Sequence, residues 1–93
     1  MGKTERLSQI FKALGEETRL EIIKLLAQKG EVGCTQINHT FKLTQPALSH
    51  HYRILKESGL VLKRKDGQYF YLSLNKVILE KYLPGFLESL NQS

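Results

Sequence analysis

The sequence predicts a mainly α-helical domain with one small β-hairpin, in the order helix, helix, short helix, turn, helix, hairpin, helix. Three observations support this fold class. Apolar residues recur at helical spacing along much of the chain, a Thr-Gln-Pro sequence marks one helix start, and an Asp-Gly pair separates two strand-like runs. The chain has 93 residues, 41% of them hydrophobic and 25% charged, so we expect one globular domain over residues 1–93.

Two amphipathic helices open the chain. In the first, apolar residues stand at the i, i+3, i+4, i+7 spacing of one helix face, and Gly15 ends the helix. These residues are Leu7, Ile10, Phe11 and Leu14. The second begins with Thr-Arg-Leu-Glu at residues 18–21, which has the form of a capping box. In that motif the Thr18 hydroxyl and the Glu21 carboxylate satisfy each other's backbone N–H groups. We expect this helix to end at Gly30.

A short helix, a tight turn and a longer helix follow. Residues 35–41 are predicted to be helical, and residues 42–44 form the turn. Thr44 can cap the next helix, because its hydroxyl can accept a backbone N–H. Pro46 stands in the first turn of that helix, where a missing N–H costs nothing. The helix is expected to end at Ser58-Gly59.

A hairpin and a final helix complete the chain. Residues 60–65 and 68–74 are predicted to pair as strands around an Asp66-Gly67 turn of type I′, which needs positive φ at both central positions. Pro84-Gly85 is expected to kink or split the last helix. Two helices joined by a three-residue turn and followed by a hairpin are the parts of a winged helix-turn-helix. The helix-turn-helix would span about residues 35–58 and the wing about residues 60–74.

The second helix of a helix-turn-helix meets base edges in the major groove through its N-terminal part. At 100° per residue, Leu48, Tyr52 and Leu55 share one narrow arc, which we expect to face the core. Gln can pair with adenine, Arg with guanine, and Ser with a base or phosphate. The DNA contacts predicted on this helix are Thr44, Gln45, Pro46, Ala47, Ser49, His50 and Arg53. The alternative is a solvated polar face. His51 lies beside the core arc, where packing or capping is the favoured role.

The chain is basic, and its excess charge is local. Residues 40–70 hold six cationic and two acidic side chains, a net charge of +4 out of the chain's +5. Such a surplus suggests a polyanionic partner, either nucleic acid or an anionic membrane surface. We predict double-stranded DNA, with the wing clamping phosphates and Arg64 or Lys65 in the minor groove. The wing contacts predicted are Lys63, Arg64, Lys65, Gln68 and Tyr69. The alternative is that the wing cations only improve solubility or guard an edge strand.

Three motifs carry a family resemblance: Thr-Arg-Leu at residues 18–20, Gln-Pro-x-x-Ser-His-His at 45–51, and Gly-Gln-Tyr-Phe-Tyr-Leu at 67–72. Through them, residues 7–74 resemble the ArsR-type (arsenic-repressor-like) winged-helix regulators. That family is prokaryotic and binds operator DNA as homodimers. The resemblance implies that Gln45, Ser49 and His50 take the family's major-groove positions and that the hairpin at 63–69 is its wing.

A homodimer is expected for two reasons. The last helix carries more apolar surface than a small core needs, and an unpartnered stripe of that size is normally an interface. The resemblance also implies an interface built from the first and last helices, here about residues 4–14 and 76–91. The contacts predicted are Leu7, Ile10, Phe11, Tyr82, Leu83, Phe86, Leu87 and Leu90. The alternative is that the nearer residues, Leu79 and Leu83, close the monomer core.

No metal site and no cofactor are predicted. Metal-sensing members of the family carry Cys-x-Cys at positions that align with Gly33 and Thr35, and a second family site uses Asp and His on the last helix. Residues 75–93 contain neither Asp nor His, and the chain has one Cys and three His. Cys34 is a candidate redox sensor, since a helix N-terminus lowers a thiol pKa. The favoured interpretation is a small buried hydrophobic residue.

These features predict a cytoplasmic, sequence-specific transcription regulator, a repressor that binds an inverted-repeat operator. A single cysteine and an N-terminus without an apolar signal segment agree with the cytoplasm. No run approaches the ~18–20 apolar residues of a membrane span, so no membrane partner is expected. The chain has no catalytic constellation, and we expect no enzyme activity. The alternatives are a non-specific architectural DNA-binding protein and a winged-helix module that binds proteins. No small-molecule effector is assigned.

Overall fold

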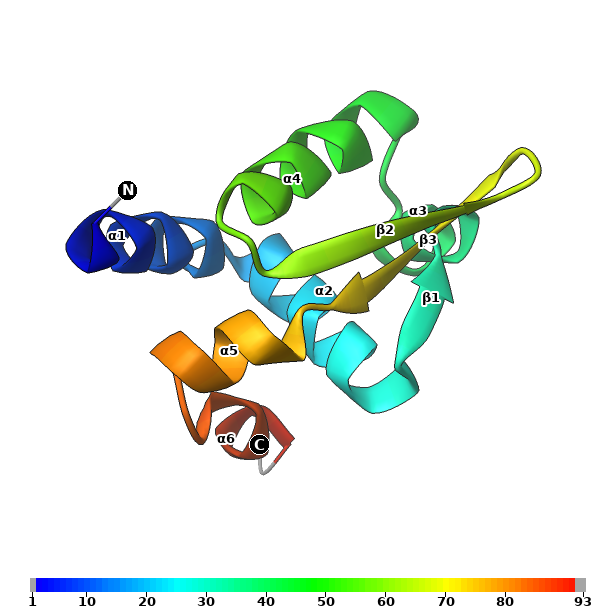
Figure 1. Cartoon of the computed structure of the whole chain (residues 1–93). Coiled ribbons are helices and arrows are strands. Elements are labelled where there is room, and N and C mark those ends of the chain that lie inside the picture. The colour runs from blue at the N-terminus through cyan, green and yellow to red at the C-terminus, as the bar shows by residue number, and fades with distance from the viewer. Residues whose placement is uncertain (1, 92–93) are drawn as a thin grey trace.

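The computed structural model describes residues 2–91 and shows a helical domain with one small sheet (Figure 1). In chain order its elements are α1 (Lys3–Leu14), α2 (Glu17–Lys29), β1 (Glu31–Gly33), α3 (Cys34–Phe41), α4 (Gln45–Glu57), β2 (Val61–Asp66), β3 (Tyr69–Leu74), α5 (Lys76–Tyr82) and α6 (Phe86–Asn91). Helices α3 and α4 form the helix-turn-helix, and strands β2 and β3 form the wing. The predicted fold class is therefore confirmed. Within the described residues, no helix is both long and apolar enough to cross a membrane.

One hydrophobic core joins the helices to one face of the sheet. Its buried members come from helices α1 to α5 and from all three strands. Ile10 corrects the predicted dimer interface, because its side chain has 0% exposed surface in the monomer. Helix α1 packs against α2 and α4, so this residue belongs to the core. Leu79 is buried as well, in agreement with the alternative that this residue closes the monomer.

The sheet has three strands in the order β1-β3-β2, all antiparallel to their neighbours. The sequence did not predict β1, because three residues with one buried member, Val32, are too short to show an alternating pattern. Val32 lies opposite Leu72 of β3, and both face the core. Strand β1 thus places Glu31 beside the wing.

The wing turn differs from the predicted one by a residue. Asp66 pairs with Tyr69, so the two-residue loop is Gly67-Gln68 and not Asp66-Gly67. Gly67 has a φ of +63°, and Lys42 is the one described non-glycine residue with positive φ. Glycine at the first central position with the second in normal backbone is the pattern of a type II′ turn. The predicted type I′ turn is therefore wrong, although the hairpin is confirmed.

The start of α2 is also corrected. The predicted capping box at Thr18 does not form; Glu16 is the N-cap instead. The backbone N–H groups of Thr18 and Arg19 both donate to the Glu16 carboxylate, each at 3.0 Å. A carboxylate that accepts two N–H groups at a helix N-terminus serves as both cap and dipole partner. The helix therefore begins at Glu17, one residue before the predicted cap.

The remaining turns follow the sequence closely. The Thr44 hydroxyl accepts the backbone N–H of Ala47 at 3.2 Å, which caps α4 as predicted. Lys42 takes the left-handed conformation, φ 56°, that ends α3. Pro84-Gly85 separates α5 from α6, so the last helix is split rather than continuous.

Candidate nucleic-acid interface

The outer side of α4 carries the polar residues that the helical period placed there. Leu48 and Leu55 are buried and Tyr52 is half-buried, so the predicted core arc is confirmed. Most of the predicted contacts are exposed, whereas Ala47 is half-buried. The exposed residues are Thr44, Gln45, Pro46, Ser49, His50 and Arg53. Figure 1 shows that the wing extends past the N-terminal end of α4, so both elements reach the same end of the domain.

The Gln45 side chain is held across the turn of the helix-turn-helix. Its Oε1 accepts a hydrogen bond from the Asn38 side-chain amide of α3. With that oxygen engaged, the NH2 group of Gln45 remains as the donor pair for a base edge. The turn therefore orients the residue that stands at the tip of α4.

The His51 side chain contacts the start of α2 and does not belong to the exposed polar side of α4. Its Nδ1 lies 3.3 Å from Nη1 of Arg19 and 3.7 Å from the Glu16 carboxylate. Desolvation by burial lowers the pKa of His51, the charge of Glu16 opposes that shift, and Arg19 and His50 add to it. The favoured packing role of His51 agrees with this geometry, whereas His50 is exposed.

Arg19 anchors a polar network that the sequence pattern did not predict. This residue is 8% exposed; its Nε donates to the Ala13 carbonyl at 2.7 Å and its Nη2 donates to the Lys12 carbonyl at 3.4 Å. These are carbonyls of the last turn of α1, which have no partner within the helix. Arg19 therefore ties the end of α1 and the start of α2 to the recognition helix through His51. The available signal was a cation within the apolar face of α2.

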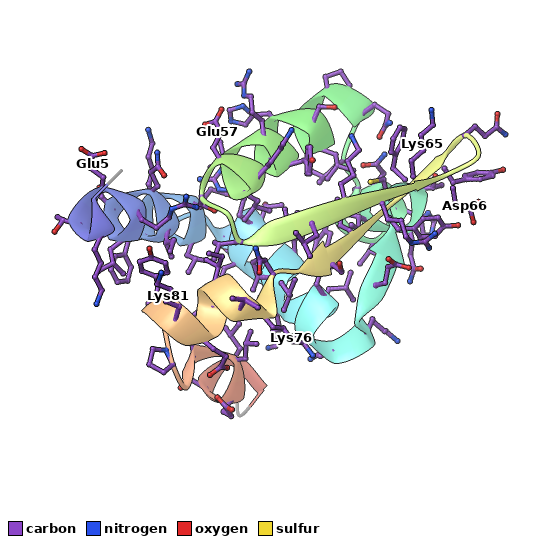
Figure 2. The ribbon with its side chains drawn as sticks, in the orientation of Figure 1. Glu5, Glu57, Lys65, Asp66, Lys76 and Lys81 are labelled. Carbon is purple, nitrogen blue, oxygen red and sulfur yellow. The ribbon has the colours of Figure 1, made fainter. Side chains whose placement is uncertain are left out.

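The wing places two of its three cations on the side of α4. The Nζ of Lys63 lies 4.7 Å from the Tyr52 ring centroid and 4.3 Å from that of Phe70, and the Nζ of Lys65 lies 5.9 Å from Phe70. Figure 2 shows Lys65 on the side of the hairpin that faces α4 and Asp66 on the other side. A basic edge thus runs beside the polar side of α4.

Arg64 projects from the opposite face of the wing. Its Nε and Nη2 donate to the two carboxylate oxygens of Glu31 at 3.0 and 2.7 Å, and its guanidinium lies 4.6 Å from the Tyr71 ring centroid. The hydrogen bond from Arg64 lowers the pKa of Glu31. Desolvation acts in the opposite direction, and the positive charge of Arg64 lowers the pKa further. The three neighbouring cations of the wing therefore do not act as one cluster.

The last two predicted contacts lie at and beside the tip of the wing. Gln68 lies in the turn and is exposed, and Tyr69 begins β3 with 55% of its surface exposed. A large aromatic side chain at an exposed tip is free to contact sugar or bases in a groove.

Comparison with known proteins identifies the family. The model of bacterial regulatory proteins of the arsR family matches residues 16–63, which include α2, the helix-turn-helix and the start of the wing. The chain belongs to the arsR family of bacterial regulatory proteins. The HTH-type transcriptional regulator YceK of Bacillus subtilis is 42% identical over 84 residues, 89% of this chain and 84% of YceK.

Two further relatives cover nearly the whole domain. The transcriptional repressor SdpR of Bacillus subtilis is 31% identical over 86 residues, 92% of this chain and 94% of SdpR. Among solved structures, HlyU from Vibrio cholerae superposes with a TM-score of 0.79 at 28% identity, covering 99% of this chain and 96% of that one. The arsR-family fold thus extends from α1 to α6.

The arsR-family chain keeps apolar side chains on the surfaces expected to form a dimer. Phe11 of α1 is 59% exposed, and Val77 of α5, which was not predicted, is 76% exposed. Apart from the fully buried Ile10, the other predicted contacts are half-buried, and those of α5, α6 and the link between them pack against the monomer core. These half-buried residues are Leu7, Tyr82, Leu83, Phe86, Leu87 and Leu90.

The environment of Cys34 in this arsR-family chain differs from the one expected of a redox-sensitive thiol. It is the first residue of α3 and half-buried, beside a small cleft of about 180 Å³ between α4 and the wing. Desolvation raises the pKa of Cys34, and the charge of Lys63 offsets this only in part. The net direction is opposite to the lowered thiol pKa that the redox hypothesis assumed. Within residues 2–91, no three His, Cys, Asp or Glu side chains are grouped so that they could share a metal ion.

Proposed function

We propose that this arsR-family protein is a transcriptional repressor that binds an inverted-repeat operator in double-stranded DNA as a homodimer. The observation that carries the proposal is the exposed polar side of α4, flanked on one side by Lys63 and Lys65 of the wing. The names of its relatives, a transcriptional regulator and a transcriptional repressor, support the same function.

The two DNA-facing elements divide the work of recognition. On α4, Gln45, Ser49, His50 and Arg53 are the base-reading residues, since hydrogen-bonding side chains near a recognition-helix N-terminus meet base edges. The N-terminal end of the helix is positioned by Thr44, Pro46 and Ala47, which contact the DNA backbone. Lys63 and Lys65 bind phosphates beside it, with Gln68 and Tyr69 at the minor groove.

The proposed dimer is supported by exposed apolar residues of α1 and α5. Phe11 and Val77 are large side chains that the monomer leaves uncovered, and such residues tend to be covered in an assembly. A twofold axis through this surface would place two α4 helices on successive major grooves, about 34 Å apart. The operator would then be an inverted repeat. Chromosomal DNA as partner places the protein in the cytoplasm.

Selection of genome fragments by the purified protein tests the proposal. At about 150 mM salt, where non-specific binding is weak, we expect retention of a few fragments that share one imperfect palindrome. Uniform retention of all fragments would favour an architectural DNA-binding protein instead. Retention of none, together with binding to a protein partner, would favour a protein-interaction module.

Selected fragments then give the specificity ratio. A repressor should bind its operator at least about 10³-fold more tightly than a scrambled sequence of the same length. A matched variant, Gln45→Ala, should lower that ratio while leaving affinity for the scrambled sequence nearly unchanged. A ratio near one for the wild-type protein would contradict the proposal.

A further inference from the structure

Glu31 and Arg64 form a two-pronged ion pair on the outer face of the sheet. Both carboxylate oxygens of Glu31 accept from the guanidinium, at 3.0 and 2.7 Å. Glu31 lies on β1 and Arg64 on β2, and the central strand β3 separates them. Tyr71 of β3 pairs with Arg64 on one side and with Gly33 on the other, and its ring lies against the guanidinium. The pair thus crosses the whole sheet.

This ion pair occupies the part of Arg64 that DNA would use. A guanidinium binds phosphate most strongly through two parallel N–H groups. The edge formed by Nε and Nη2 is taken by Glu31, and Nη1 lies 3.9 Å from the Asp66 carboxylate. Two carboxylates therefore surround the cation, and the outer face of the wing offers little net positive charge. Lys63 and Lys65, on the other face, have no carboxylate at comparable distance among the ion pairs of the described residues.

The ion pair between Glu31 and Arg64 is also easily broken. The side chains of Arg64 and Glu31 are 52% and 40% exposed, and exposed ion pairs contribute little to stability because water and salt compete with them. A phosphate that approaches the wing can therefore replace Glu31 at the guanidinium. Glu31 opposes this exchange because its own negative charge remains beside the DNA backbone.

We propose that Glu31 restrains the DNA affinity of the wing by holding Arg64, which binds a backbone phosphate once it is released. The inference rests on the proposed DNA-binding function. It concerns Glu31, a residue that is not among the proposed DNA contacts. In this arrangement Arg64 adds little affinity in the wild-type protein, and loss of the Glu31 charge makes its contribution visible.

A double-mutant cycle on the full chain tests this proposal. The substitutions are Glu31→Gln, Arg64→Gln and both together, with the selected operator fragment as probe and salt varied from about 50 to 200 mM. Glu31→Gln should bind about two- to fivefold more tightly, in line with loss of an exposed ion pair. Its slope of log K against log salt should be steeper by about 0.9 for each added phosphate contact. Arg64→Gln should change the Kd less than twofold, and the double variant should match Arg64→Gln.

Glu57→Gln is the matched control, since it removes the same charge from the exposed side of α4. Any gain in DNA affinity from Glu57→Gln should persist when Arg64→Gln is added. The gain in affinity from Glu31→Gln should disappear in the same combination. Thermal unfolding of every variant identifies changes in folding. Unchanged or weaker binding by Glu31→Gln would overturn the proposal, as would a gain that survives Arg64→Gln. Failure of the wild-type protein to prefer any operator would instead refute the proposed function itself.

Discussion

The Nη1 atom of Arg19 lies 3.3 Å from Nδ1 of His51, and this contact joins the start of α2 to the recognition helix. The same guanidinium binds the last carbonyls of α1, and Glu16 lies within 3.9 Å of both side chains. Three helices therefore meet at one mostly buried cation. The network thus contacts both α4 and α1, and α1 is one of the two regions predicted to form the dimer.

Arg19→Ala should lower the free energy of unfolding by about 2 kcal/mol, because buried carbonyls would lose charged donors. Arg19→Lys should recover only part of this loss, since one ammonium group cannot reach all three partners. Urea unfolding followed by circular dichroism measures the difference. Arg53→Ala, an exposed cation on α4, is the control and should stay within about 0.5 kcal/mol of wild type. Equal effects of the two alanine variants would contradict the anchoring role.

Protonation of His51 should destabilise the fold. Its pKa is lowered from 6.5, chiefly by desolvation, so the unfolded chain binds more protons than the folded protein near and below that pH. Stability should therefore be full above about pH 6.5 and should fall as the pH drops below it. Glu16 titrates in a separate, lower range. Desolvation raises its pKa, but the two backbone hydrogen bonds and the nearby cations lower it more, to below 4.5 overall.

The measurement is the urea midpoint between about pH 7.5 and 5. His51→Gln should flatten the pH dependence over this range. His50→Gln, on the exposed side of α4, should leave most of the slope, because His50 is the last and smallest of the causes that lower the pKa of His51. If both variants retained the wild-type slope, another group would be responsible and the assignment to His51 would be wrong.

Base reading and phosphate binding should separate by mutation. Arg53→Ala and His50→Ala should each reduce the preference for operator over scrambled DNA, by about 1–3 kcal/mol where a base pair is lost. Lys63→Ala should weaken binding to both DNAs by a similar factor and reduce the salt slope by about one. Competition binding at several salt concentrations distinguishes these effects. Similar behaviour of all three variants would contradict the division of roles between α4 and the wing.

The sequence predicted the recognition helix well because its signals are local. The Thr44 cap, Pro46 and the spacing of Leu48, Tyr52 and Leu55 all act within one helix, and each is confirmed. A helical period also identifies which side chains share a face, so the exposed polar side of α4 could be named in advance.

The long-range contacts could not be predicted in the same way. Arg19 and His51 are 32 residues apart, and Glu31 and Arg64 are 33 residues apart. The second pair exists only because β1, too short to be recognised, joins the sheet beside β3. The shift of the wing turn has a similar origin. It depends on how the two strands pair along their length: Val61 lies opposite Leu74 and Asp66 opposite Tyr69, which leaves Gly67-Gln68 as the loop.

Phe11→Glu should convert the protein to monomers and weaken operator binding. Phe11 is 59% exposed on α1, and a charge there would have to be buried without a partner in the proposed dimer. The wild-type protein should sediment as a dimer at about 10 µM, because interfaces of standard size are occupied at this concentration. Leu62→Glu, a similarly exposed apolar residue on β2 at 52%, is the control and should remain dimeric. Monomeric wild-type protein would contradict the proposed assembly. A dimeric Phe11→Glu variant would place the interface elsewhere and would direct attention to Val77 and α6.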